Sequence, residues 1–158
     1  MQVASEQEAL YVACEMESTA VQLYTRALAL MEQLGRKQEP LYARIQQMCR
    51  DEQMHLYRFR SLYTGLEAEQ EQQLSLAAVG EGLLFDGGLM GAVRAGLLKD
   101  TQSMLDVAAQ SERASARKYR EFAEQAQTEE ARRTLKMIAL EEDSHLRDLE
   151  EDVRRDTL

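Results

Sequence analysis

The sequence is poor in helix breakers and in the residues that build small cross-linked scaffolds. It has one proline, two cysteines and no tryptophan. Without a C-x-x-C pair, the chain cannot form a four-cysteine zinc or iron site, and whether Cys14 and Cys49 form a disulfide stays open. No apolar run approaches the roughly 20 residues needed to span a bilayer, and the N-terminal residues do not read as a secretory signal. We therefore expect a cytoplasmic protein with no membrane contact.

Positive charge is also scarce. Lys and Arg total 19 against 28 Asp and Glu, which gives a formal net charge of −9. Bulk attraction to nucleic acid or to an anionic membrane surface is thereby excluded. A hydrophobic content of 44% argues against disorder. A chain of 158 residues suffices for one domain with its own core, so we expect a single domain over residues 1–158.

Glycine divides the chain, because six of the eight glycines lie between positions 80 and 96. On either side, core-facing positions recur at alternating spacings of four and three, as one face of a packed helix requires. The pattern predicts helices over about 5–34, 40–62, 96–127 and 128–155, with Ser5 and Thr128 as caps. The connection over 66–95 could be helical near 70–79. Four long helices with a long crossover between the second and third predict an all-α, ferritin-like antiparallel four-helix bundle.

Each of the four expected core faces is interrupted by a glutamate, which is rarely buried without a partner. In the second and fourth helices a histidine follows three residues later, on the same face and one turn away. Too few basic residues lie on these faces to neutralise four carboxylates, whereas two divalent cations would do so. Helical bundles that bind two metals through carboxylates have a recurring ligand set. Two of their helices provide one Glu each, and the other two provide a Glu-x-x-His motif each. The predicted metal ligands are Glu17, Glu52, His55, Glu112, Glu142 and His145.

The two halves of the chain repeat this arrangement. Seven residues separate Glu17 from Tyr24 in the first half and Glu112 from Tyr119 in the second. The Glu-x-x-His helices repeat as DEQMH and EEDSH. Two helical hairpins related by a pseudo-twofold axis would place both ligand sets around one centre.

These motifs resemble the rubrerythrin-like branch of the ferritin-like di-iron superfamily, over residues 5–153 apart from the crossover. The resemblance implies that Glu52 and Glu142 are bridging carboxylates and that Glu17 and Glu112 are terminal carboxylates. It implies that His55 and His145 are the nitrogen ligands. It also implies iron that cycles between ferrous and ferric while hydrogen peroxide or dioxygen is reduced. It favours Tyr24 and Tyr119 as hydrogen-bond donors to ligand carboxylates over a role in packing alone.

Two departures limit what the resemblance implies. Ser115 stands where rubrerythrin usually has a second glutamate, and the usual rubredoxin domain is missing. Electrons would therefore come from a separate protein or a small reductant, or the reaction would be ferroxidation instead. Iron is the expected metal, with manganese or zinc as alternatives. A non-catalytic iron-binding or iron-handling protein is the alternative function, and a bundle with a vestigial site that serves a partner is a third.

Three further expectations concern the surroundings of the site. Asp51 and Glu141 lie one residue off the core face and are expected to face solvent. Cys14 is expected to be a buried thiol with no redox role. We expect a homodimer, with the first helix or the apolar segment 83–85 as the contact surface.

Overall fold

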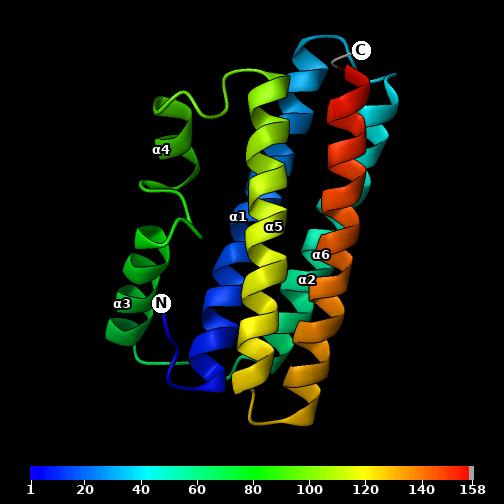
Figure 1. The fold of residues 1–158 in the computed structure, drawn as a ribbon. Coiled ribbons are helices and arrows are strands. Elements are labelled where there is room, and N and C mark those ends of the chain that lie inside the picture. The colour runs from blue at the N-terminus through cyan, green and yellow to red at the C-terminus, as the bar shows by residue number, and fades with distance from the viewer. Residues whose placement is uncertain (157–158) are drawn as a thin grey trace.

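A bundle of four long helices forms the body of the protein, and the computed structural model describes residues 1–156 of it. The elements are α1 (Glu6–Gln33), α2 (Pro40–Leu62), α3 (Ala68–Gly80), α4 (Gly88–Arg94), α5 (Thr101–Gln125) and α6 (Glu129–Asp156), with no strand in this range. Helices α1 and α2 form one hairpin and α5 and α6 the other, and the hairpins meet where α1 packs on α5 and α2 on α6 (Figure 1). The predicted ferritin-like all-α bundle is confirmed.

Local signals set most helix ends. The Ser5 hydroxyl accepts a hydrogen bond from the Glu8 amide, Pro40 is the first residue of α2, and Thr128 Oγ1 accepts from the Ala131 amide. The third long helix differs from its prediction, because it begins at Thr101 and not at Gly96. Gly96 has φ +77° and ends a turn, and the Asp100 side chain caps α5 instead.

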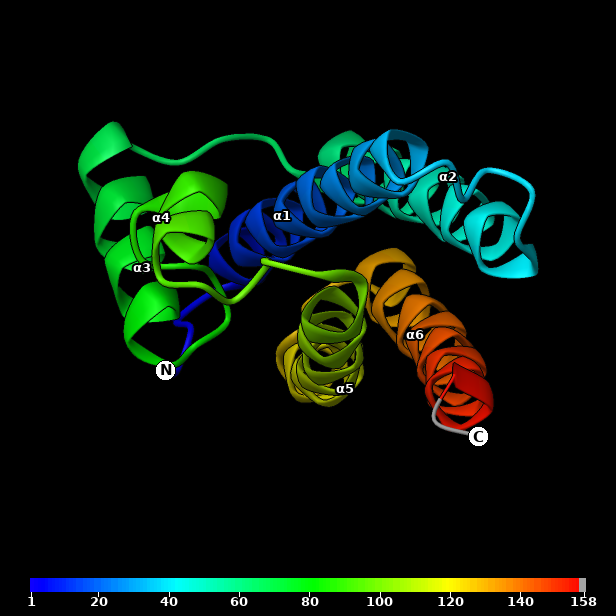
Figure 2. The same ribbon diagram turned by 90° about the horizontal axis from the view of Figure 1, so that it is seen from above.

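The crossover lies along the outer side of α1, with α4 above α3 along the length of the bundle (Figure 1) and both away from α2 and α6 (Figure 2). Between them, Gly82 at φ +77° turns the chain so that Leu83 enters the core. The segment 83–85, a candidate dimer surface from sequence, therefore packs on its own chain. Gly91 is required within α4, because a Cβ there would lie 1.9 Å from the Asp86 carbonyl oxygen.

The apolar core is split into two clusters with a polar layer between them. One cluster surrounds Leu10, Phe122 and Ile138, and the other surrounds Ile45 and Leu105. The predicted metal ligands lie at the level where the two clusters meet, near the middle of each long helix. Among the described residues, no helix is both long enough and apolar enough to cross a membrane.

Candidate metal centre

The structure brings all six predicted ligands into one buried cluster at the middle of the bundle. The largest exposure in the set is the 7% of His145. Their ligand atoms fall into two groups, within each of which all lie within 4.8 Å of one another. The groups are Glu17, Glu52, His55 and Glu142, and Glu52, Glu112, Glu142 and His145. Glu52 and Glu142 belong to both groups, so two metal positions would share these two carboxylates.

Every member of the cluster has a buried polar atom that makes no hydrogen bond of regular geometry, although several of these atoms lie at ion-pair distance from one another. These atoms are Glu17 Oε2, Glu52 Oε1, His55 Nδ1, Glu112 Oε2, Glu142 Oε1 and His145 Nδ1. A buried polar atom that is poorly paired is costly, so six of them at one place favour a ligand that binds them together. Carboxylate oxygens and imidazole nitrogens suit iron and manganese and also bind zinc. The cluster is able to hold two metal ions, and its residues fit a di-iron centre.

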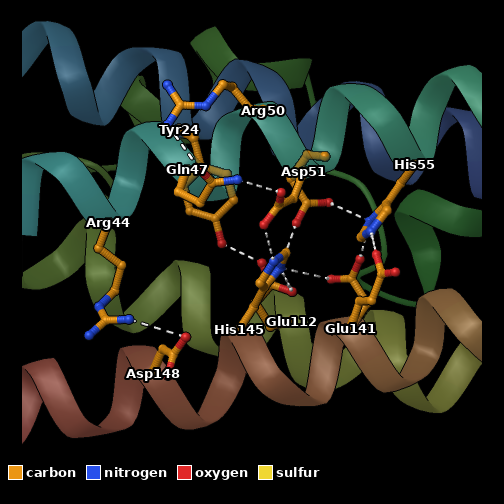
Figure 3. Close-up of polar contacts among 12 residues, drawn as sticks. Tyr24, Arg44, Gln47, Arg50, Asp51, His55, Glu112, Glu141, His145 and Asp148 are labelled. Carbon is orange, nitrogen blue, oxygen red and sulfur yellow. Dashed lines mark hydrogen bonds and ion pairs between the residues drawn. The ribbon is translucent and has the colours of Figure 1, made fainter.

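The two histidine rings point one nitrogen inward and the other outward. His55 Nδ1 lies 2.8 Å from Glu142 Oε1, and His145 Nδ1 lies 3.0 Å from Glu52 Oε1. On the outward side, His55 Nε2 contacts Glu141, and His145 Nε2 donates to Asp51 Oδ2 at 3.0 Å (Figure 3). A carboxylate on the outer nitrogen fixes the tautomer and orientation of a ligating histidine.

The contacts of Asp51 and Glu141 correct the expectation that these residues only face solvent. Their side chains are 36% and 42% exposed, yet each holds a histidine on the opposite helix. Gln47 in turn donates to Asp51 Oδ1 at 2.8 Å. The repeated acidic pairs Asp51-Glu52 and Glu141-Glu142 are the sequence signal that could have identified them.

The two tyrosines join the hairpins across the centre. The Tyr24 hydroxyl on α1 donates to Glu112 on α5, and the Tyr119 hydroxyl on α5 donates to Glu17 Oε1 on α1 at 2.8 Å. Burial, and next the adjacent carboxylate, raise the pKa of each tyrosine well above its usual value. Both phenols therefore stay protonated and act as donors. The expected contacts with carboxylates are present, and they follow the pseudo-twofold repeat.

The carboxylates of the cluster differ in charge. Burial, followed by repulsion from nearby carboxylates, raises the pKa of Glu17 and Glu142 well above the usual range. Burial would also raise the pKa of Glu52, but hydrogen bonds with Glu17 and both histidines outweigh it and hold that pKa below the usual range. In the metal-free protein some carboxyls therefore keep their protons.

The histidines are the cationic partners of these carboxylates in the absence of metal. Burial alone would lower their pKa values. Hydrogen bonds to Glu17 and Glu52 raise the pKa of His55 to about 10, and those to Glu112 and Glu52 raise that of His145 to about 11. Protons thus stand in for cations at the centre, and metal binding has to displace them.

Cysteine takes no part in the cluster. Cys14 and Cys49 are both free and buried. Burial raises the pKa of the Cys14 thiol to about 11, which leaves it protonated and poorly nucleophilic near neutral pH. The expectation of a buried thiol at position 14 is confirmed.

Comparison with known proteins identifies the family. The family model for rubrerythrin matches residues 8–152, which include all six clustered residues and both tyrosines. Neither the curated proteins nor the solved structures contain a significant match. The chain belongs to the rubrerythrin family, whose members bind a di-iron centre.

Proposed function

We propose that the protein is a di-iron oxidoreductase that reduces hydrogen peroxide or dioxygen. In this proposal two metals would be held together by the shared residues Glu52 and Glu142. Glu17 and His55 would complete one ligand group, and Glu112 and His145 the other. The observation that carries the assignment is the overlap of the two ligand groups in Glu52 and Glu142.

Reduction of hydrogen peroxide requires two electrons and two protons, breaks the O–O bond and yields two water molecules. The residues of the cluster would hold two ferrous ions, and this pair would provide the two electrons on oxidation to the ferric state. The chain's own residues position and insulate the centre. Asp51 and Glu141 hold the histidine rings, and the phenols of Tyr24 and Tyr119 keep a proton directed at Glu112 and Glu17. The apolar clusters above and below exclude water and strengthen these electrostatic interactions.

The electrons for a further cycle need a source other than the two cysteines, Cys14 and Cys49. Two cysteines cannot form a rubredoxin-type centre, so another redox centre or a small reductant would reduce the ferric ions. Both cysteines are free, which supports a reducing compartment such as the cytoplasm.

The test starts from protein loaded anaerobically with two ferrous ions per chain and mixed with hydrogen peroxide. We expect ferric absorbance to appear rapidly, and peroxide consumption to continue when a reductant is added. Glu52→Ala, which removes a carboxylate shared by both groups, is the negative control. If the bound iron were oxidised once and no reductant supported further peroxide consumption, the result would favour a non-catalytic iron-handling protein instead. Protein that takes up no iron would mark the site as vestigial.

A further inference from the structure

A cavity lies between α1, α5 and the crossover, where residues within one turn of Glu17 and Glu112 in sequence line it. Its volume is about 90 Å³, room for a few water-sized molecules. Met16 and Thr19 line it from α1, and Ser111 and Ser115 line it from α5. The residues 82–85 form its outer wall. The crossover thus covers a hollow that the four-helix bundle alone would leave open.

Ser115 connects this pocket with the centre. It lies on the buried face of α5, three residues after Glu112 and four before Tyr119, about one helical turn from each. The residue is only 6% exposed, and within residues 1–156 its hydroxyl has no hydrogen-bond partner. The Ser115 hydroxyl lines the cavity without a protein partner, so it is available to bind a small polar occupant.

The opposite side of the centre has a wider groove, of about 350 Å³, but charged side chains and His145 line it. Between α2 and α6 the two histidine rings lie 5.9 Å apart, and Asp51 and Glu141 cover their outer nitrogens. A molecule that arrived from the α2/α6 groove would meet these interactions first. The α1/α5 side offers a preformed space, and no charged residue lines it.

We propose that hydrogen peroxide enters and binds in the pocket between α1, α5 and residues 82–85, with the Ser115 hydroxyl as its hydrogen-bonding anchor. Hydrogen peroxide is small and neutral, and it both donates and accepts hydrogen bonds. These properties match a small pocket that has no charged residue and one hydroxyl without a protein partner. The wall formed by residues 82–85 excludes bulky organic hydroperoxides, so the pocket sets the substrate class. This inference rests on the proposed function, because it supplies the oxidant to that centre.

Methionine oxidation tests the pocket without iron chemistry. Peroxide transfers one oxygen atom to a thioether, which becomes a sulfoxide, and leaves as water. Met16 lines the pocket, whereas Met48 and Met104 are equally buried in the other cluster. In zinc-loaded protein treated with hydrogen peroxide, we expect peptide mass spectrometry to show Met16 oxidised well before Met48 and Met104. Tert-butyl hydroperoxide should oxidise the exposed Met54 and spare Met16.

Two variants of Ser115 separate space from hydrogen bonding. Ser115→Leu fills the pocket, and Met16 oxidation should fall to the rate of Met48 while that of Met54 is unchanged. Ser115→Ala keeps the space and loses the anchor, so peroxide affinity should fall about fivefold. The matched control is Ser144→Leu, the same change in the groove between α2 and α6. It should leave Met16 oxidation at the wild-type rate.

The same variants, loaded with iron, show whether the pocket serves the centre. With unchanged iron content and helicity, Ser115→Leu should slow ferrous oxidation by peroxide and Ser144→Leu should not. The pocket assignment would be overturned if Met16 were oxidised as slowly as Met48 in the wild type. It would also be overturned if Ser144→Leu slowed ferrous oxidation more than Ser115→Leu. If peroxide oxidised Met16 but failed to oxidise the ferrous iron of the wild-type protein, the proposed function would be overturned and the pocket assignment would stand.

Discussion

At the scale of single residues, the outward-facing carboxylates matter as much as the buried ones. We predict that Asp51→Asn and Glu141→Gln each lower metal affinity about 10–100-fold, because the histidine behind each would lose its fixed orientation. Chelator competition with zinc measures the change. Asp148→Asn is a matched control, since Asp148 lines the same groove but pairs with Arg44 (Figure 3). Equal losses in all three variants would contradict a specific role in holding the histidines.

The histidines also make metal binding depend on pH. With pKa values of about 10 and about 11, both are protonated at neutral pH in the metal-free protein. A metal ligand must be the neutral ring, so binding releases protons and rising pH favours it. We therefore expect zinc affinity to increase from pH 6 to pH 8, with proton release visible to an indicator dye in weak buffer. Affinity that stays constant over this range would show that the rings are neutral beforehand.

At the scale of elements, the sequence predicted what local and periodic signals specify. Three of the four long helices begin where their caps or the proline indicated, and the four glutamates and two histidines lie on buried faces as the spacing required. The predicted start of α5 was wrong, because the cap at Asp100 and the turn at Gly96 override the apolar pattern that continues through them. The short helix α4 was missed, since its glycines read as a loop and Gly91 serves a close backbone contact. Asp51 and Glu141 were missed because their partners lie on another helix.

A contact between elements gives the next prediction. Glu6, at the start of α1, accepts hydrogen bonds from the amides of Gln127 and Thr128 and from the Thr128 hydroxyl, where α6 begins. We predict that Glu6→Ala lowers the free energy of unfolding by about 2 kcal/mol, since bonds to a charged acceptor are lost together. Urea denaturation of the metal-free protein measures this. Glu8→Ala, which removes one exposed contact to the Ala4 amide, should cost clearly less.

At the scale of the whole molecule, the metal centre is where the two hairpins interact through charge. Each ligand group draws on both hairpins, and each tyrosine donates to a carboxylate of the other hairpin. Metal binding therefore stabilises the packing of one half of the chain on the other. Without metal, the same place holds buried carboxyl groups and protonated histidines whose desolvation is costly, so the core is less stable than an apolar core of this size.

This conflict between function and stability predicts opposite effects of one substitution. Glu142 is buried beside Glu112, Glu52 and Glu17, and burial followed by their repulsion raises its pKa, so its charged form opposes folding. Glu142→Gln keeps the shape and the neutral state of the protonated carboxyl without its cost of deprotonation, so the metal-free variant should be as stable as the wild type or more stable by about 1 kcal/mol. Wild-type protein should gain about 3 kcal/mol from zinc at a hundredfold excess over Kd, and the variant should lose most of that gain. Thermal melts with and without zinc measure both. If the metal-free variant were instead less stable by several kcal/mol, Glu142 would be a structural residue and not a metal ligand.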